Sequence, residues 1–296
     1  IEPTADHASD HATGRLRLAN VLEVLIAHED DPLRKVELLH QVAEIYEVHV
    51  EDAQRAFAAY ARAFPIDPQN HATLTALDRL ADKLGAWPQL AALYDEAITK
   101  LRKDSPEVTV DLALRAAQVF ELRMSDVQQA IQRYGIVAEI EPEHLQTLEA
   151  LERLYEGTER WAQLAHVLER KVSVASSPDE ILAIQFKLGQ LQQHRLNSID
   201  QAVAHYREIL AAAPEHREAL SALEELFERG VEVAAISEIL EPLYRMQEAW
   251  DRLIGVQQAA LRVQPDPDER ISMMQRIAEI AEDRADDKPT AFLWMQ

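Results

Sequence analysis

The chain has 296 residues, 47% of them apolar, and its 52 acidic and 30 basic residues give a formal net charge of −22. This apolar share excludes a disordered protein, and the charge disfavours nucleic acid and anionic membrane surfaces, which bind mainly through Lys and Arg. The absence of cysteine excludes disulfides, thiol catalysis and thiolate metal sites.

Helix-forming residues dominate the composition. Glycine occurs only 7 times, and strand-type alternation is nearly absent, so we expect an all-α protein. No apolar run approaches about 18 residues and the first residues do not resemble a signal peptide, so we expect no direct membrane insertion. The excess of Arg over Lys suggests a bacterial source. The compartment stays open, with the cytoplasm favoured.

Residues 1–13 are polar and are expected to form an N-terminal tail. Within them His7 and His11 are four residues apart, a helical spacing that could hold a divalent metal. Because polar terminal segments usually fray, we expect no metal site and no cofactor.

Four later segments begin with Asp or Ser followed by proline, at Pro32, Pro106, Pro178 and Pro267. Asp and Ser cap helix N-termini, and proline suits the first helical position, where its missing N–H costs nothing. We therefore expect equivalent helices to begin at these four prolines.

A second pattern occurs three times: alanine opens it, tyrosine follows four places on, and proline closes it. Its copies start 74 and then 72 residues apart. They comprise Ala56, Tyr60 and Pro68; Ala130, Tyr134 and Pro142; and Ala202, Tyr206 and Pro214. The closing proline cannot continue a helix, so each copy predicts a helix and the turn that follows it.

After the first two copies comes a further helix that starts with tryptophan, at Trp87 and Trp161, and the same type recurs at Trp250. Recurrence at one repeat position favours a packing role for these rings over ligand stacking. Each block of 72–74 residues thus predicts four helices in two hairpins, and residues 14–230 form a regular double repeat.

The rhythm breaks once, after residue 230. Ala291, the next equivalent of Ala202, comes 89 residues later, which exceeds the earlier spacing by 17 residues, about one helix and its turn. Residues 231–296 are therefore expected to continue the repeat after an irregular extra helix. The sequence stops inside a helix, so we expect the natural chain to continue or this end to dock on a partner.

These segments resemble the tetratricopeptide repeat family, whose unit of about 34 residues carries W-x2-L-G-x2-Y in its first helix and A-x3-F…P in its second. The first motif falls on Val42, Ala43 and Tyr46, on Ala116, Ala117 and Phe120, and on Leu188, Gly189 and Gln192. The resemblance implies a right-handed α-solenoid of stacked helix-turn-helix repeats. The second unit of each double repeat, which we call an even unit, differs from the family at one position. There the charged residues Asp78, Glu152 and Glu224 stand where the family has a small residue.

In that family the first helices of the hairpins line a concave groove, which implies a partner-binding face here. Its residues would be His40, Glu44, Glu47, Arg79, Asp82, Gln118, Glu121, Glu149, Arg153, Glu156, Gln190, Glu225 and Glu228. The excess of acids predicts a basic or mixed-charge protein or peptide, with Arg79 and Arg153 each pairing with an acid of the ligand. The other interpretation is that these residues are only solvated helix surface.

Catalytic motifs such as a glycine-rich phosphate loop, GxSxG or HExxH are absent from the sequence. We therefore expect no enzyme but a protein-interaction scaffold that binds a partner segment in the groove. Two alternatives stay open: a structural subunit of a larger multiprotein assembly, and the interaction arm of a longer enzyme or regulator. The oligomeric state is not predicted.

Overall fold

The computed structural model describes residues 5–285 and 287–295, with the side chains of residues 5–12 and of Met295 outside the description. This part of the chain is all-α and contains no strand, as the composition predicts. Its α-helices are α1 (Ala5–His28), α2 (Pro32–Glu44), α3 (Ala53–Ala63), α4 (His71–Leu84), α5 (Trp87–Leu101), α6 (Pro106–Gln118), α7 (Val127–Ile140), α8 (Leu145–Gly157), α9 (Trp161–Val174), α10 (Pro178–Leu191), α11 (Ile199–Ala212), α12 (Arg217–Glu228), α13 (Val233–Met246), α14 (Trp250–Val263), α15 (Pro267–Asp283) and α16 (Lys288–Met295).

The proline signals are confirmed, because α2, α6, α10 and α15 each have proline as their first residue. The cap comes from the preceding residue in three of these helices. Asp31 accepts a hydrogen bond from the backbone N–H of Leu33 at 3.0 Å, and Asp266 and Ser177 cap in the same manner. Local chemistry thus determines where these helices begin.

Three wider, π-helical turns extend the first helices: η1 (Ile45–His49) after α2, η2 (Val119–Arg123) after α6, and η3 (Gln192–Leu196) after α10. One or two residues past each turn the backbone has a positive φ, of 56° at Glu51, 54° at Ser125 and 53° at Asn197. The sequence predicts continuous helices there and misses these turns. An inserted π turn redirects the side chains that follow it, and such turns are frequent at functional sites.

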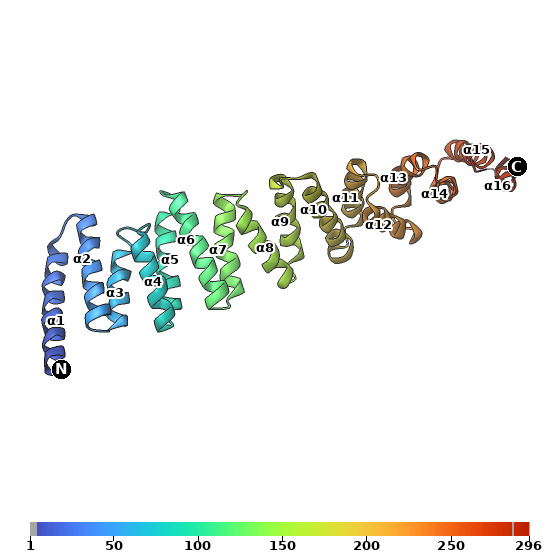
Figure 1. Cartoon of the computed structure of the whole chain (residues 1–296). Coiled ribbons are helices and arrows are strands. Elements are labelled where there is room, and N and C mark those ends of the chain that lie inside the picture. Colours follow the sequence, from blue (N-terminus) through green and yellow to red (C-terminus); the bar gives the residue numbers. More distant parts are fainter. Residues whose placement is uncertain (1–4, 286, 296) are drawn as a thin grey trace. The chain divides into compact units, whose positions relative to one another are not determined.

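Neighbouring helices along the chain pack against one another from α1 to α7 and again from α9 to α16 (Figure 1). Small residues lie at the closest contacts: Ala56, Ala130 and Ala202 are all completely buried. The aromatic positions lie beside them, with Tyr206 fully buried, Tyr134 buried and Tyr60 half-buried. Within each of these two stretches, successive hairpins therefore complete one another's core, which is the packing of a helical-repeat solenoid.

The chain forms two compact units, Ile1–Leu154 and Tyr155–Gln296. Helices α13 and α14 follow each other and pack together within the second unit. Helix α1 begins at Ala5, inside the range expected to be a tail. The domain limits at residues 13 and 230 remain predictions. Among the described helices, none has the length and apolarity needed to cross a bilayer.

Candidate protein-interaction face

The predicted groove residues lie on the first helices of the hairpins (α2, α4, α6, α8, α10 and α12) and on the turns η1 and η2. We call the surface that these residues form in each unit the first-helix face. The exposed members are Glu44, Arg79, Asp82, Gln118, Glu149, Arg153, Glu156, Gln190, Glu225 and Glu228, and the half-buried ones are His40, Glu47 and Glu121. Most of the face is therefore accessible to a partner.

Both arginines of the face are paired within the chain. Arg79 of α4 makes a bidentate ion pair with Glu47 of η1, with 2.9 Å between Nη2 and Oε2. Arg153 of α8 forms an ion pair with Glu121 of η2. The hydrogen bonds from Arg79 hold the pKa of Glu47 below its ordinary value. The expectation that these arginines stand ready for acids of a ligand is thus corrected, because a ligand acid would have to compete with an internal carboxylate.

A tyrosine completes this arrangement. The Tyr134 hydroxyl donates to Oε2 of Glu121 at 3.0 Å, and in the next block the Tyr206 hydroxyl donates to Oε1 of Gln193 at 2.8 Å. Burial, followed by the charge of Glu121, raises the pKa of Tyr134 to about 12. The sequence analysis did not predict this combination of ion pair and tyrosine hydrogen bond. The signal was present as a fixed spacing, since Arg79 follows Glu47 by 32 residues and Arg153 follows Glu121 by the same number.

Other contacts link neighbouring first helices. Asp82 pairs with Arg123 at 3.4 Å in the first unit, and Glu156 pairs with Lys187 at 2.9 Å in the second. His40 lies 2.7 Å from the Thr73 hydroxyl, and burial lowers its pKa. Within each unit the structure therefore places predicted residues of consecutive first helices side by side.

Acids at the small-residue position of the even units also have structural partners. The Tyr94 hydroxyl donates to Asp78 at 3.1 Å, and the Tyr244 hydroxyl donates to Glu224. Burial, together with these acids, raises the pKa of both tyrosines. Asp78 and Glu224 therefore link their helices to a later one through hydrogen bonds.

The three recurring tryptophans are half-buried, and each has a guanidinium over its ring. Arg123 lies 4.8 Å from the centroid of Trp87, and Arg195 lies 4.8 Å from that of Trp161. Trp250 has Arg284 in the same role. The spacing of these arginines follows the repeat, and such stacking favours the packing role predicted for the rings.

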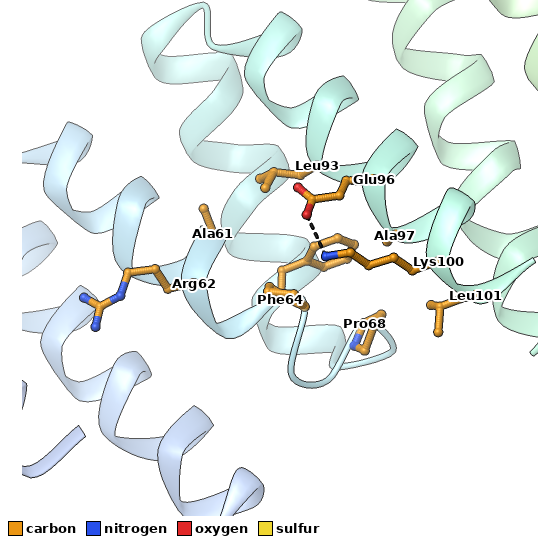
Figure 2. Close-up of a pocket in the computed structure, with 10 residues that line it drawn as sticks. Ala61, Arg62, Phe64, Pro68, Leu93, Glu96, Ala97, Lys100 and Leu101 are labelled. Carbon is orange, nitrogen blue, oxygen red and sulfur yellow. Dashed lines mark hydrogen bonds and ion pairs between the residues drawn. The ribbon is translucent and has the colours of Figure 1, made fainter. Parts of the chain in front are cut away.

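Two hollows matter for binding. One, of about 360 Å³, lies between the second helices α3 and α5 and has a mainly apolar lining that includes Phe64 and Leu93, with the Lys100–Glu96 ion pair at its edge (Figure 2). The other, of about 420 Å³, lies on the first-helix face between α10, η3, α11 and α12. Only the second includes predicted groove residues, Gln190 and Glu225.

Metal binding has no support in the described residues, where no group of three or more His, Asp or Glu is placed to hold an ion. The side chains of His7 and His11 lie outside the described part.

Helices packed in consecutive pairs, an alanine with a tyrosine at three equivalent positions, and a double repeat of 72–74 residues are the features of a tetratricopeptide-like helical-repeat fold. Among solved structures, the chain is similar to a tetratricopeptide repeat protein from Parabacteroides merdae, at 14% identity over 88% of this chain and 99% of that one, with a TM-score of 0.36.

It is also similar to two structures of MamA. The first is 16% identical over 62% of this chain and 94% of that one, with a TM-score of 0.31. The second is 12% identical over 74% and 92%, with a TM-score of 0.29. Likenesses this weak carry no functional argument. No protein-family model and no curated protein matches the chain.

Proposed function

We propose that this chain is a non-catalytic protein-interaction scaffold whose first-helix face binds a basic or mixed-charge segment of a partner protein. The observation that supports it most is the pairing of Arg79 and Arg153 with acids of the same face. Exposed carboxylates without an ion pair among the described residues remain at Glu44, Glu149 and Glu228. The face therefore offers negative charge, which favours positively charged groups.

Catalysis has no place in the proposal, because the tyrosines and acids with shifted pKa values serve in structural pairs such as Tyr134–Glu121 and Arg79–Glu47. A net charge of −22 also repels phosphate backbones, so the partner we propose is a protein.

The test reverses the unpaired charges in Glu44→Lys/Glu149→Lys/Glu228→Lys and measures binding of a library of synthetic peptides sorted by net charge. We expect wild-type protein to retain the basic and mixed-charge peptides, more weakly as salt rises, and the variant to bind them roughly tenfold less tightly. Glu121 is unsuitable for reversal because Tyr134 and Arg153 depend on it.

A matched control makes the same charge change outside the first-helix face. It is the triple variant Asp200→Lys/Glu238→Lys/Asp251→Lys, at exposed positions of α11, α13 and α14. The control should bind the peptides like the wild type. Equal losses in the two triple variants would show that net charge alone attracts the peptides, and the first-helix face would then have no special role.

A further inference from the structure

The third double repeat departs from the first two at the arginine pair. In the first two, a carboxylate on the π turn (Glu47, Glu121) holds an arginine of the following first helix (Arg79, Arg153). The equivalent residues of the third are Gln193 on η3 and Glu225 on α12. An amide thus replaces the carboxylate, and a carboxylate replaces the guanidinium.

The 420 Å³ hollow on the first-helix face lies at this place. Its lining includes Phe186, Gln190, Gln193, Tyr206, Ser221 and Glu225, all in the second compact unit. Because Glu225 stands at the position of Arg153, the arginine that pairs with the π-turn carboxylate in the first two double repeats has no equivalent at Gln193 among the described residues. The hollow is therefore where the third repeat lacks the cation of the other two.

Gln193 is buried and only half satisfied. Its side chain is 6% exposed, and its Oε1 accepts from the Tyr206 hydroxyl. Its Nε2 has no hydrogen-bond partner in the described part of the chain. A buried amide N–H without an acceptor is unfavourable, so an acceptor supplied by a ligand would stabilise this site.

Glu225 is exposed, and its ion pair with Arg229 is loose, at 3.7 Å. The half-buried ring of Phe186, whose centroid lies 5.9 Å from that of the buried Tyr206, offers a face for a planar cation. The lining also contains His194 and Arg217, and Arg217 is eight residues from Glu225, about 12 Å along α12. Arg217 therefore lies at the start of α12, away from the position that Arg79 and Arg153 occupy in the earlier repeats.

We infer that this hollow binds an arginine side chain from the partner segment, an inference that rests on the proposed function. The guanidinium takes the place of Arg79 and Arg153, pairs with Glu225 and lies against the ring of Phe186. A backbone carbonyl of the same segment accepts from Nε2 of Gln193. Arginine is favoured over lysine because its planar fork can donate to a carboxylate while its face stacks on a ring.

The experiment follows the side-chain amide signals of Gln193 by NMR in the full chain, during titration with a short capped glycine–serine peptide that carries one central arginine. The matched probe has citrulline, which keeps the shape but lacks the charge. We expect a saturable shift with arginine and affinity at least about tenfold lower with citrulline or in Glu225→Gln. Glu238→Gln, the same change at an exposed position of α13 outside both the hollow and the first-helix face, should bind like the wild type.

A second variant, Gln193→Glu/Glu225→Arg, rebuilds the pair of the earlier repeats. It should fold and lose arginine binding, because its own guanidinium occupies the hollow. Equal binding of arginine and citrulline, or undiminished binding by Glu225→Gln, would overturn the inference.

The two proposals can fail separately. If arginine does not shift Gln193 while the face triple variant still loses the basic peptides, the site assignment is wrong and the scaffold proposal stands. If arginine binds here as expected while the face triple variant binds basic peptides like the wild type, the wider scaffold proposal fails.

Discussion

At the scale of a single residue, Gly189 is the glycine at which an added side chain would meet its neighbours most closely. It lies on α10, at the position equivalent to Ala43 on α2 and Ala117 on α6. A Cβ atom added to Gly189 would come 2.5 Å from Cε1 of Tyr206. Because Tyr206 is fully buried, its ring cannot move aside. Gly189→Ala should therefore lower the free energy of unfolding by about 1–3 kcal/mol, measured by urea denaturation.

Gly135, on α7, is the control for this prediction. A Cβ atom there would meet nothing within 4 Å, so Gly135→Ala should gain helix propensity and raise the free energy of unfolding by about 0.5–1 kcal/mol. Effects of the same sign in the two variants would contradict the close contact between α10 and α11.

At the scale of an element, the α6–α7 hairpin depends on the small residue at the start of its second helix. Ala130 is completely buried, whereas Gln132, two residues on, is exposed. Ala130→Leu should overpack the contact and cost about 1–3 kcal/mol. Gln132→Leu should be nearly neutral, and similar melting temperatures for the two variants in calorimetry would refute the repeat alignment.

At the scale of the whole molecule, the buried tyrosines make stability depend on alkaline pH. The pKa of Tyr134 is about 12 in the folded chain against 10.0 ordinarily, and burial also raises the pKa of Tyr94, Tyr206 and Tyr244. The unfolded chain then loses these protons first, so the contribution of these tyrosines to the free energy of unfolding should be fully present below about pH 10, and the free energy should fall between about pH 10 and 12.

Tyr134→Phe isolates one of these groups. It removes one titrating hydroxyl, so its free energy of unfolding should fall less steeply over this pH range than that of the wild type. The measurement is urea denaturation at a series of pH values. Parallel curves of unfolding free energy against pH for the two proteins would mean that Tyr134 has the same pKa in the folded and the unfolded chain.

The sequence by itself determined the helices and their order. Helix starts at Pro32, Pro106, Pro178 and Pro267 followed from capping chemistry, which acts within one turn and needs no tertiary context. The double repeat likewise predicted the hairpins, because each alanine-to-proline copy is a local pattern. The position of the candidate face came from the family resemblance, and its binding role remains a proposal.

Only the tertiary structure decided which side chains meet. The π turns, the pairing of Arg79 with Glu47 and the hollow at Gln193 all depend on helices that stack after they form. The 32 residues between Arg79 and Glu47 do not reveal that the two meet until η1 and α4 lie side by side. Local sequence signals determine where helices begin and end. Ion pairs and buried polar groups depend instead on how hairpins pack, because packing sets the distance between two charges and their burial. Packing therefore decides which charged side chains are paired within the chain and which can bind a partner.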